Sequence, residues 1–310
     1  MDDLKQKKIL VFGTGAVGGY YGGKLVKAGY DVTFIARGKN HDILKQNGLT
    51  LIEESEKNVF PIKIHENSKE LGHFDFILIC TKARETKNVV KNIINNVSEK
   101  TQIASFQNGA ENEEIIASVF GVDKTIGASL YVNSWLVDPG VVEVLGNYYI
   151  TIGSLTTKET KEVKELGEIF KSSGIKSNIS SDIVADIWNK LVWNAAVNPL
   201  SVLTKKTLDE ILDDKDLYGL VRNILIEGRD VALANGINIR RDTVEYNLAC
   251  VKNYKRGIIT STLQDYERGK PIEVEEIIGV IVRKANKVGM KVPNIEKVYN
   301  DLLKLVSVCV

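Results

Sequence analysis

Residues 8–37 read KILVFGTGAVGGYYGGKLVKAGYDVTFIAR, and this stretch determines the predicted fold of the first part of the chain. Ile9 to Phe12 form a short apolar run that ends in glycines, which is typical of a buried strand. Ala16 to Lys27 has helical character and is closed by Gly29, a residue suited to a helix C-terminus. Val32 to Ala36 is a second apolar run. This order predicts a strand–helix–strand unit with parallel strands.

The turn between the first strand and the helix has the pattern G-x-G-x-x-G. The first glycine permits a tight turn, the second lets the backbone approach a pyrophosphate, and the third allows helix and strand to pack closely. The helix N-terminus attracts the anion. The alternative is a glycine-rich turn without a ligand, but the position between a strand and a helix favours a dinucleotide. We therefore expect the cofactor to contact Gly13, Thr14, Gly15, Ala16, Val17 and Gly18.

The end of the second strand indicates which dinucleotide binds. An NAD site usually has an acidic residue about 20 residues past the glycines. Here the strand ends in Arg37, with Lys39 nearby, whereas Asp31 stands at the other end. A cation suits the extra phosphate of NADP, so we expect NADP (NADPH); the alternative is a solvent-exposed loop arginine. Lys82, just past a later strand, is a second candidate cation for the cofactor.

The rest of the first half alternates strand and helix patterns. The polar stretch Glu54–Asn58 predicts a loop between two strands, and Gly146-Asn147 predicts a hairpin turn. The apolar runs that predict these further strands are Leu49–Glu53, Phe60–Ile64, Phe74–Cys80, Gln102–Phe106, Val141–Leu145 and Tyr148–Ile152.

Helical periodicity dominates from about Lys158, and strand patterns nearly vanish after Ile179. We therefore expect the α/β class, with an N-terminal Rossmann-type doubly wound sheet and an all-helical C-terminal domain. Residues 1–179 are the predicted NADP-binding domain, and residues 180–310 are the predicted substrate-binding domain.

Composition excludes several classes of partner. Lys+Arg number 41 and Asp+Glu 40, so the net charge of +1 provides no strong overall field for nucleic acid or a membrane surface, and the alternative is a local basic patch. No apolar run is long enough for a transmembrane helix. The three cysteines, Cys80, Cys250 and Cys309, are too widely spaced for a disulfide framework or a zinc site, so we expect no metal and a cytoplasmic protein. The expected partner is a small-molecule substrate. The sequence does not decide the oligomeric state, and a homodimer is one expectation.

A line of polar residues follows a long helix predicted over residues 182–203. A spacing of four places these residues on one face of the helix. The alternative is a solvent-facing stripe, but no charged residue occurs from Leu191 to Leu203, and Trp188 and Trp193 flank the line. The pattern therefore favours a buried polar wall. Its members are Asp182, Asp186, Lys190, Asn194 and Asn198.

A lysine followed by two asparagines suits the reduction of a ketone. That reaction needs a hydride from nicotinamide and a proton for the developing alkoxide. The three histidines all lie within the first quarter of the chain, so a histidine donor in the second half is excluded. Lys190 can donate the proton and stabilise the alkoxide by its charge. Asn194 and Asn198 can hydrogen-bond hydroxyl or carbonyl groups of the substrate.

Two further segments carry candidate site residues. Asn108 stands in SFQNG (105–109), directly after a predicted strand, where ligands bind in such sheets. The alternative there is a simple Asn-Gly turn. Ser261 opens STLQD (261–265), and Glu273 follows Pro271. The alternative for Glu273 is a favourable acid in the first turn of a helix that Pro271 opens.

These segments together resemble the ketopantoate reductases, the NADPH-dependent enzymes of pantothenate and coenzyme A synthesis. The resemblance covers nearly the whole chain, and the lysine–asparagine segment is its most specific part. It rests on GTGAVGG (13–19), QNG (107–109), K-x3-N-x3-NPL (190–200), and S-x2-QD (261–265) followed by Glu273.

The resemblance implies an oxidoreductase that reduces 2-dehydropantoate (ketopantoate) to pantoate. It implies that Lys190 is the proton donor and that Asn194, Asn198 and Ser261 hold the substrate. Asn108 and Glu273 would lie where cofactor and substrate meet, with Glu273 counted beside Lys190 among the catalytic groups. The family fold is a Rossmann domain joined to an all-helical domain.

One residue departs from the family pattern. Three residues before Ser261 the family often has an asparagine, and here Ile258 stands in its place. The exact substrate therefore stays open between ketopantoate and another 2-keto acid or an imine. A nucleotide-sensing protein without catalysis is a further alternative, which the presence of Lys190, Asn194 and Glu273 disfavours.

Overall fold

The structure is a computed structural model that describes residues 2–146, 148–156, 159–251 and 256–308. The chain divides into two compact units. The first, called the α/β unit below, comprises Met1–Gln107 and Asn112–Ile183. The second, called the helical unit, comprises Asn108–Glu111 and Val184–Val310. The short segment Asn108–Glu111 therefore belongs to the helical unit, although it follows a strand of the α/β unit in the sequence.

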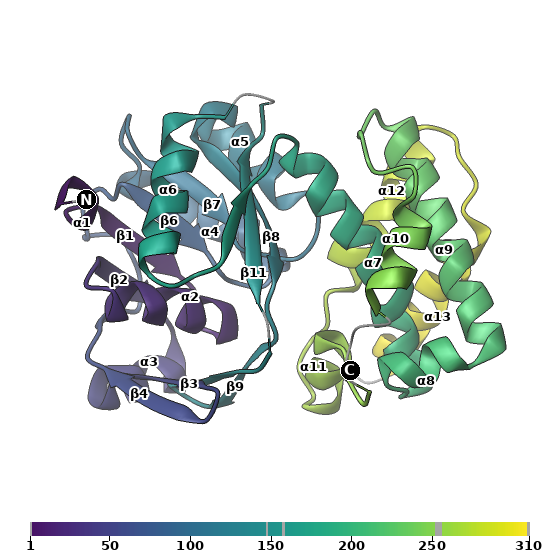
Figure 1. Ribbon diagram of the computed structural model, residues 1–310, viewed down its shortest axis with the longest axis horizontal. Helices are drawn as coiled ribbons and strands as arrows, with labels where there is room; N and C mark the ends of the chain where they lie inside the picture. Colours follow the sequence, from purple (N-terminus) through teal and green to yellow (C-terminus); the bar gives the residue numbers. More distant parts are fainter. Residues whose placement is uncertain (1, 147, 157–158, 252–255, 309–310) are drawn as a thin grey trace. The chain divides into compact units, whose positions relative to one another are not determined.

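The main sheet of the α/β unit has eight strands among the described residues, in the order β12-β11-β8-β7-β6-β1-β2-β5 (Figure 1). Neighbouring strands are parallel except β8 and β11. The chain passes from β1 to β2 and β5 on one side and then to β6, β7 and β8 on the other. The strand order thus reverses between β1 and β6, the place where doubly wound sheets bind ligands. The strands are β1 (Lys8–Phe12), β2 (Asp31–Ile35), β5 (Lys63–His65), β6 (Phe76–Ile79), β7 (Gln102–Ser105), β8 (Thr125–Tyr131), β11 (Tyr149–Ser154) and β12 (Ser177–Ile179).

Helices cover both faces of this sheet. Ile9 and Val11 contribute to one core with residues of α2 and α6, whereas Leu10 and Phe12 contribute to the other core with residues of α4 and α5. The alternation follows from the pleat of β1, whose successive side chains point to opposite faces. The helices of this unit are α1 (Asp2–Lys5), α2 (Ala16–Lys27), α3 (Gly38–Asn47), η1 (Ala83–Glu85), α4 (Thr86–Ile93), η2 (Ile94–Asn96), α5 (Asn112–Phe120), η3 (Val122–Lys124) and α6 (Lys161–Ser172).

Helix α2 is rich in glycine because it packs closely against two sheets. A Cβ atom at Gly22 would lie 2.3 Å from the Phe34 ring of the main sheet, and one at Gly19 would lie 2.6 Å from Cγ2 of Val142 in a smaller sheet. Larger residues would push the helix away from both layers. The smaller sheet has the order β4-β3-β10-β9. Its strands are β3 (Leu49–Glu53), β4 (Glu56–Phe60), β9 (Ser134–Asp138) and β10 (Val141–Val144).

Two sequence-based predictions were wrong in this smaller sheet. The predicted loop Glu54–Asn58 is largely strand, because β4 pairs antiparallel with β3. β4 is an edge strand that is mostly exposed, so its polar residues show no clear apolar alternation. The predicted hairpin is also absent, since β10 pairs with β3 and β9 while β11 pairs with β8 and β12. Asn147 of the predicted turn lies outside the described residues.

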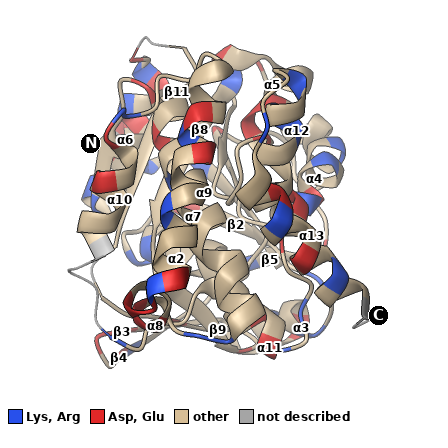
Figure 2. Ribbon diagram, turned by 90° about the vertical axis from the view of Figure 1, so that its right-hand side faces the viewer, with Lys and Arg blue, Asp and Glu red and all other residues tan. Residues whose placement is uncertain are grey.

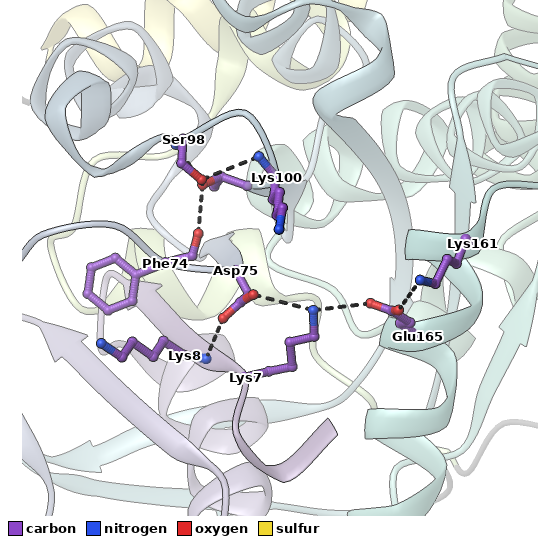
Figure 3. A network of polar contacts seen from close by, with 9 residues as sticks. Lys7, Lys8, Phe74, Asp75, Ser98, Lys100, Lys161 and Glu165 are labelled. Atoms are coloured by element: carbon purple, nitrogen blue, oxygen red, sulfur yellow. Dashed lines mark hydrogen bonds and ion pairs between the residues drawn. The ribbon is translucent and has the colours of Figure 1, made fainter. Parts of the chain in front are cut away.

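A network of charges ties together the amino ends of two central strands (Figure 3). The Lys8 backbone N–H donates to Oδ2 of Asp75 at 2.9 Å, and Nζ of Lys7 lies 3.3 Å from Oδ1 of Asp75. Nζ of Lys7 also lies 3.4 Å from Oε2 of Glu165 on α6, which in turn pairs with Lys161. These contacts join β1, β6 and α6 at the edge of the sheet where the strands begin. The candidate cofactor residues lie at the opposite edge, at the carboxyl ends of the strands.

The described elements of the helical unit are all helical. Helix α9 packs directly against α7. The two helices are so close that a Cβ atom at Gly228 would lie 2.9 Å from Cγ1 of Val192. Helix α9 also contacts α8, α10, α12 and α13. The helices are α7 (Ile183–Thr204), α8 (Leu208–Asp213), α9 (Lys215–Ala234), α10 (Thr243–Val251), α11 (Ser261–Glu267), the π-helix η4 (Glu275–Gly279), α12 (Val280–Lys287) and α13 (Pro293–Val308).

The predicted fold class is confirmed: a Rossmann-type doubly wound sheet is followed by a helical unit. Within the described residues, no helix is both long and apolar enough to cross a membrane. Acidic and basic residues are interspersed along the ribbon (Figure 2).

Candidate active site

The glycine-rich turn joins β1 to α2 and is fastened to the end of β2. The backbone N–H groups of Gly13 and Thr14 donate to the carbonyl oxygen of Ile35, at 3.0 and 3.1 Å, and the Thr14 hydroxyl donates to the same oxygen at 3.0 Å. Asn40 donates from Nδ2 to the Thr14 carbonyl at 2.7 Å. The turn is therefore held in place by contacts within the α/β unit.

Packing within the protein explains two glycines of the turn but not the third. Gly13 has a φ of +102°, and a Cβ atom there would lie 2.8 Å from Thr81. A Cβ atom at Gly18 would lie 2.0 Å from the Gly13 carbonyl oxygen. At Gly15, by contrast, no described atom beyond the neighbouring residues lies within 4 Å of the added Cβ, and no side chain caps the helix that begins there. Open space before a helix N-terminus fits the close approach of an anionic group such as a pyrophosphate.

The two candidate cations for the cofactor lie at the carboxyl edge of the main sheet. Arg37 follows β2 and is exposed at the N-terminus of α3, and Lys82 follows β6 and is exposed. Since β2 and β6 flank β1, both cations belong to strands next to the glycine turn. Asp31 begins β2 and pairs with Lys63 at 2.7 Å, so it stands at the opposite end of that strand.

Helix α7 carries the predicted polar line among buried apolar side chains. Lys190 and Asn194 are partly buried, and Asn198 is buried. Pro199 lies inside the helix. Their neighbours Leu191, Val192, Ala195 and Ala196 are all buried. The second half of the line is thus surrounded by apolar groups, which makes its polar atoms depend on specific partners.

Lys190 has both a hydrogen-bond acceptor and a carboxylate in its surroundings. Its Nζ donates to Oδ1 of Asn108 at 2.9 Å. Burial lowers the pKa of Lys190 to about 8, and the negative charge of Glu273 opposes this by favouring the ammonium. An ammonium whose pKa lies near the working pH is suited to general acid catalysis.

Asn198 and Glu273 line the same small pocket of the helical unit. Both are buried, and the remaining lining is mostly apolar. Its free volume of about 10 Å³ has room for one water molecule, so the pocket brings these two polar side chains together without enclosing a substrate. The lining residues are Asn198, Pro199, Thr262, Ile272, Glu273, Val274, Ile277, Ile278 and Leu302.

Ser261 is exposed at the start of α11, and its neighbour connects it to α7. Thr260 caps α11, since its hydroxyl oxygen accepts from the Leu263 N–H. The same hydroxyl lies 2.5 Å from the Ser201 hydroxyl, which donates to the Asn198 carbonyl at 2.8 Å. Through these contacts the α11 N-terminus is tied to the segment of α7 that carries Asn198.

The structure therefore groups the predicted residues into two sets. Lys190 contacts Asn108 and is influenced by Glu273, while Asn198 shares a pocket with Glu273, all within the helical unit. The glycine turn, Arg37 and Lys82 belong to the α/β unit.

The sequence analysis missed a group of charged residues in the helical unit. Arg283 forms ion pairs with Glu111 and Glu275, two acids that stand close in sequence to Asn108 and Glu273. Arg283 and Glu111 are 172 residues apart, so no local sequence pattern predicts that they form an ion pair.

One histidine–acid group occurs among the described residues of the α/β unit. Nδ1 of His41 lies 3.1 Å from Oδ1 of Asp42 and 3.7 Å from Oε1 of Glu66. The imidazole is buried and both carboxylates are exposed. The short distance to Asp42 is explained by a hydrogen bond of the imidazole.

The fold and the site together define the class of Rossmann-type oxidoreductases with a helical second unit. The sequence matches the family model "Ketopantoate reductase PanE/ApbA" over residues 9–157 and "Ketopantoate reductase PanE/ApbA C terminal" over residues 182–306. The 2-dehydropantoate 2-reductase of Archaeoglobus fulgidus is 31% identical over 293 residues, which cover 93% of this chain and 94% of that one.

Solved structures of this family have the same fold. The 2-dehydropantoate 2-reductase of Methylococcus capsulatus matches with a TM-score of 0.86 and 32% identity, covering 97% of each chain. A PanE/ApbA family ketopantoate reductase of Ralstonia eutropha matches with a TM-score of 0.90 and 26% identity, covering 97% of this chain and 99% of that one. The chain belongs to the ketopantoate reductase family of oxidoreductases.

Proposed function

We propose that this protein is an NADPH-dependent 2-dehydropantoate 2-reductase, which reduces ketopantoate to pantoate for the synthesis of pantothenate and coenzyme A. The observation that carries the proposal is the arrangement around Lys190, which contacts Asn108 and whose charge Glu273 favours. Family membership supports the substrate. The free thiols of Cys80 and Cys250 fit the reducing cytoplasm as its location.

The α/β unit offers the residues that would hold the cofactor. The open space at Gly15 and the N-terminus of α2 fit a pyrophosphate, and Arg37 would bind the extra phosphate of NADPH. Lys82 adds a second cation at the carboxyl edge of the sheet. When bound, the nicotinamide supplies the hydride for the carbonyl carbon.

The helical unit offers the residues that would act on the substrate. The Lys190 ammonium donates a proton to the carbonyl oxygen as negative charge develops on it, and its charge stabilises that oxygen beforehand. Asn194, Asn198 and Ser261 hydrogen-bond the substrate's hydroxyl and carboxylate groups. Asn108 orients the Lys190 amine through their hydrogen bond, and Glu273 keeps that amine protonated.

The direct test is the oxidation of NADPH on adding ketopantoate, with pyruvate, oxaloacetate and 2-oxoisovalerate measured in parallel. We expect the highest kcat/KM with ketopantoate. A higher value with another acid would assign the protein to a related 2-keto acid dehydrogenase, the reading that Ile258 keeps open. Saturable NADPH binding without turnover of any acid would instead indicate a nucleotide sensor and would overturn the proposal.

A further inference from the structure

Arg283 of α12 connects two acidic residues through its guanidinium group. Nη2 lies 2.7 Å from Oε2 of Glu111, and Nη1 lies 2.7 Å from Oε2 of Glu275. Nη2 also donates to the Glu275 carbonyl at 3.1 Å. The Tyr299 hydroxyl of α13 donates to the other carboxylate oxygen of Glu275 at 2.6 Å. The fork of the guanidinium thus engages two separate segments at once.

Both of these segments carry a residue of the candidate active site. Glu111 ends the segment Asn108–Glu111, which begins with the acceptor of the Lys190 hydrogen bond. Glu275 begins the π-helix η4, two residues after Glu273. Arg283 therefore joins the short segments that bring Asn108 and Glu273 to Lys190, and all of these residues belong to the helical unit.

Gly279 leaves the space that this ion pair occupies. A Cβ atom at Gly279 would lie 2.6 Å from Oε2 of Glu275 and 3.2 Å from Nη1 of Arg283. The glycine stands at the end of the π-helix, a rare element that is found frequently at functional sites. The absence of a side chain at Gly279 therefore lets Arg283 and Glu275 form their ion pair close to the backbone of η4.

We propose that Arg283 is a positioning residue, which holds the segments of Asn108 and Glu273 in the geometry that Lys190 requires. The inference rests on the proposed role of Lys190 as proton donor. Side chains of Arg283, Glu111 and Glu275 are 45%, 34% and 49% exposed, and ion pairs at such sites contribute little to folding stability. Loss of Arg283 should therefore affect the site far more than the fold.

The experiment compares Arg283→Met with Arg222→Met. Arg222 on α9 is a matched control, because it is 48% exposed and also pairs with a carboxylate, that of Glu245, in the same unit. We expect Arg283→Met to lower kcat by about 10- to 100-fold, the range for a misplaced catalytic group, with melting temperature and NADPH affinity unchanged. Arg283→Lys, which can engage one carboxylate but not both, should recover part of the loss. Arg222→Met should leave kcat unchanged.

A second measurement tests whether Glu273 is held near Lys190, and it does not require turnover. The titration of the Lys190 amine is followed by its rate of acetylation as a function of pH in ligand-free protein. We expect its midpoint to fall in Arg283→Met, because the Glu273 carboxylate that favours the ammonium is no longer held, and to stay constant in Arg222→Met. A midpoint in folded Arg283→Met that equals the wild-type value overturns the inference. If the wild type reduces no keto acid, the proposed function fails, and this titration still decides the positioning role.

Discussion

Lys190 is the residue on which the proposed chemistry depends most. Replacing it with alanine removes both the acid and the charge that faces the developing alkoxide. General acid catalysis contributes about 10²–10⁴-fold, so we expect turnover at saturating ligands to fall by at least that order. NADPH affinity should change little, because most of the candidate cofactor residues lie in the α/β unit. Lys215→Ala, an exposed lysine of the same unit, is the control. Retention of more than about a tenth of wild-type turnover would exclude Lys190 as the proton donor.

Glu273 should determine where activity declines at high pH. The alkaline limb of kcat/KM reports the acid of the free enzyme, here Lys190 with a pKa of about 8. The carboxylate stabilises the ammonium and so raises that pKa against the effect of burial. In Glu273→Gln the ammonium loses this support, its pKa falls, and the limb moves to lower pH. Glu267→Gln on α11 is the control, and a limb that stays in place or moves upward would contradict the role.

Arg37 should decide between the two nicotinamide cofactors. The extra phosphate of NADPH would meet the guanidinium, whereas NADH has no group there. Arg37→Ala should therefore raise the KM for NADPH by an amount equivalent to roughly 1.5–3 kcal/mol and leave that for NADH nearly unchanged. Lys45→Ala, near the other end of α3, controls for the loss of a nearby charge. If Arg37→Ala raises the KM values for NADPH and NADH equally, Arg37 does not bind the extra phosphate.

At the scale of the element, the glycine turn and α2 allow function to be separated from folding. Gly15→Ala adds a methyl group at φ −86° where no described atom beyond the neighbouring residues lies within 4 Å. The expected loss of stability is therefore only that of alanine at a helix N-cap, below about 1 kcal/mol, while NADPH binding weakens. Gly18→Ala places the methyl 2.0 Å from a carbonyl oxygen, and we expect it to destabilise the α/β unit by about 1–3 kcal/mol. Thermal unfolding and NADPH titration of both variants are the measurements. Unaltered NADPH affinity in Gly15→Ala would place the pyrophosphate elsewhere.

The elements that could be predicted from the sequence are those with a local pattern. β1, α2 and β2 follow from two apolar runs around a helical segment, and the polar line of α7 follows from a spacing of four. β4 and β9 are partly exposed strands without such alternation, and their pairing depends on partners distant in sequence. The hydrogen bond from Lys190 to Asn108 joins residues that are 82 positions apart in the sequence, so it could be found only in the folded structure.

At the scale of the whole molecule, the candidate residues are divided between the two units. The glycine turn, Arg37 and Lys82, which are proposed to bind the phosphates of the cofactor, lie in the α/β unit. The residues proposed to move the proton lie in the helical unit, and these include Asn108 and Glu273, which are also expected near the nicotinamide. Changes in binding of NADPH and changes in turnover are therefore expected to separate according to the unit that is altered.

Glu113 should make the stability of the protein depend on pH. It is buried in the first turn of α5, and burial raises its pKa from 4.5 to about 7, although a hydrogen bond with Ser105 opposes the shift. The folded state thus holds this proton more tightly than the unfolded state, so stability falls as pH rises from about 4.5 to 7. The loss approaches roughly 3 kcal/mol above pH 7, since each pKa unit corresponds to about 1.4 kcal/mol.

Glu113→Gln retains the shape of the neutral side chain but cannot ionise. Its melting temperature should match the wild type near pH 4, below both pKa values, and exceed it near pH 8, by roughly 2–4 °C for each kcal/mol recovered. Glu70→Gln, an exposed acid of the same unit that does not influence Glu113, should show no such difference between the two pH values. If Glu113→Gln is no more stable than the wild type at pH 8, the buried carboxylate is not the group that loses stability as it ionises.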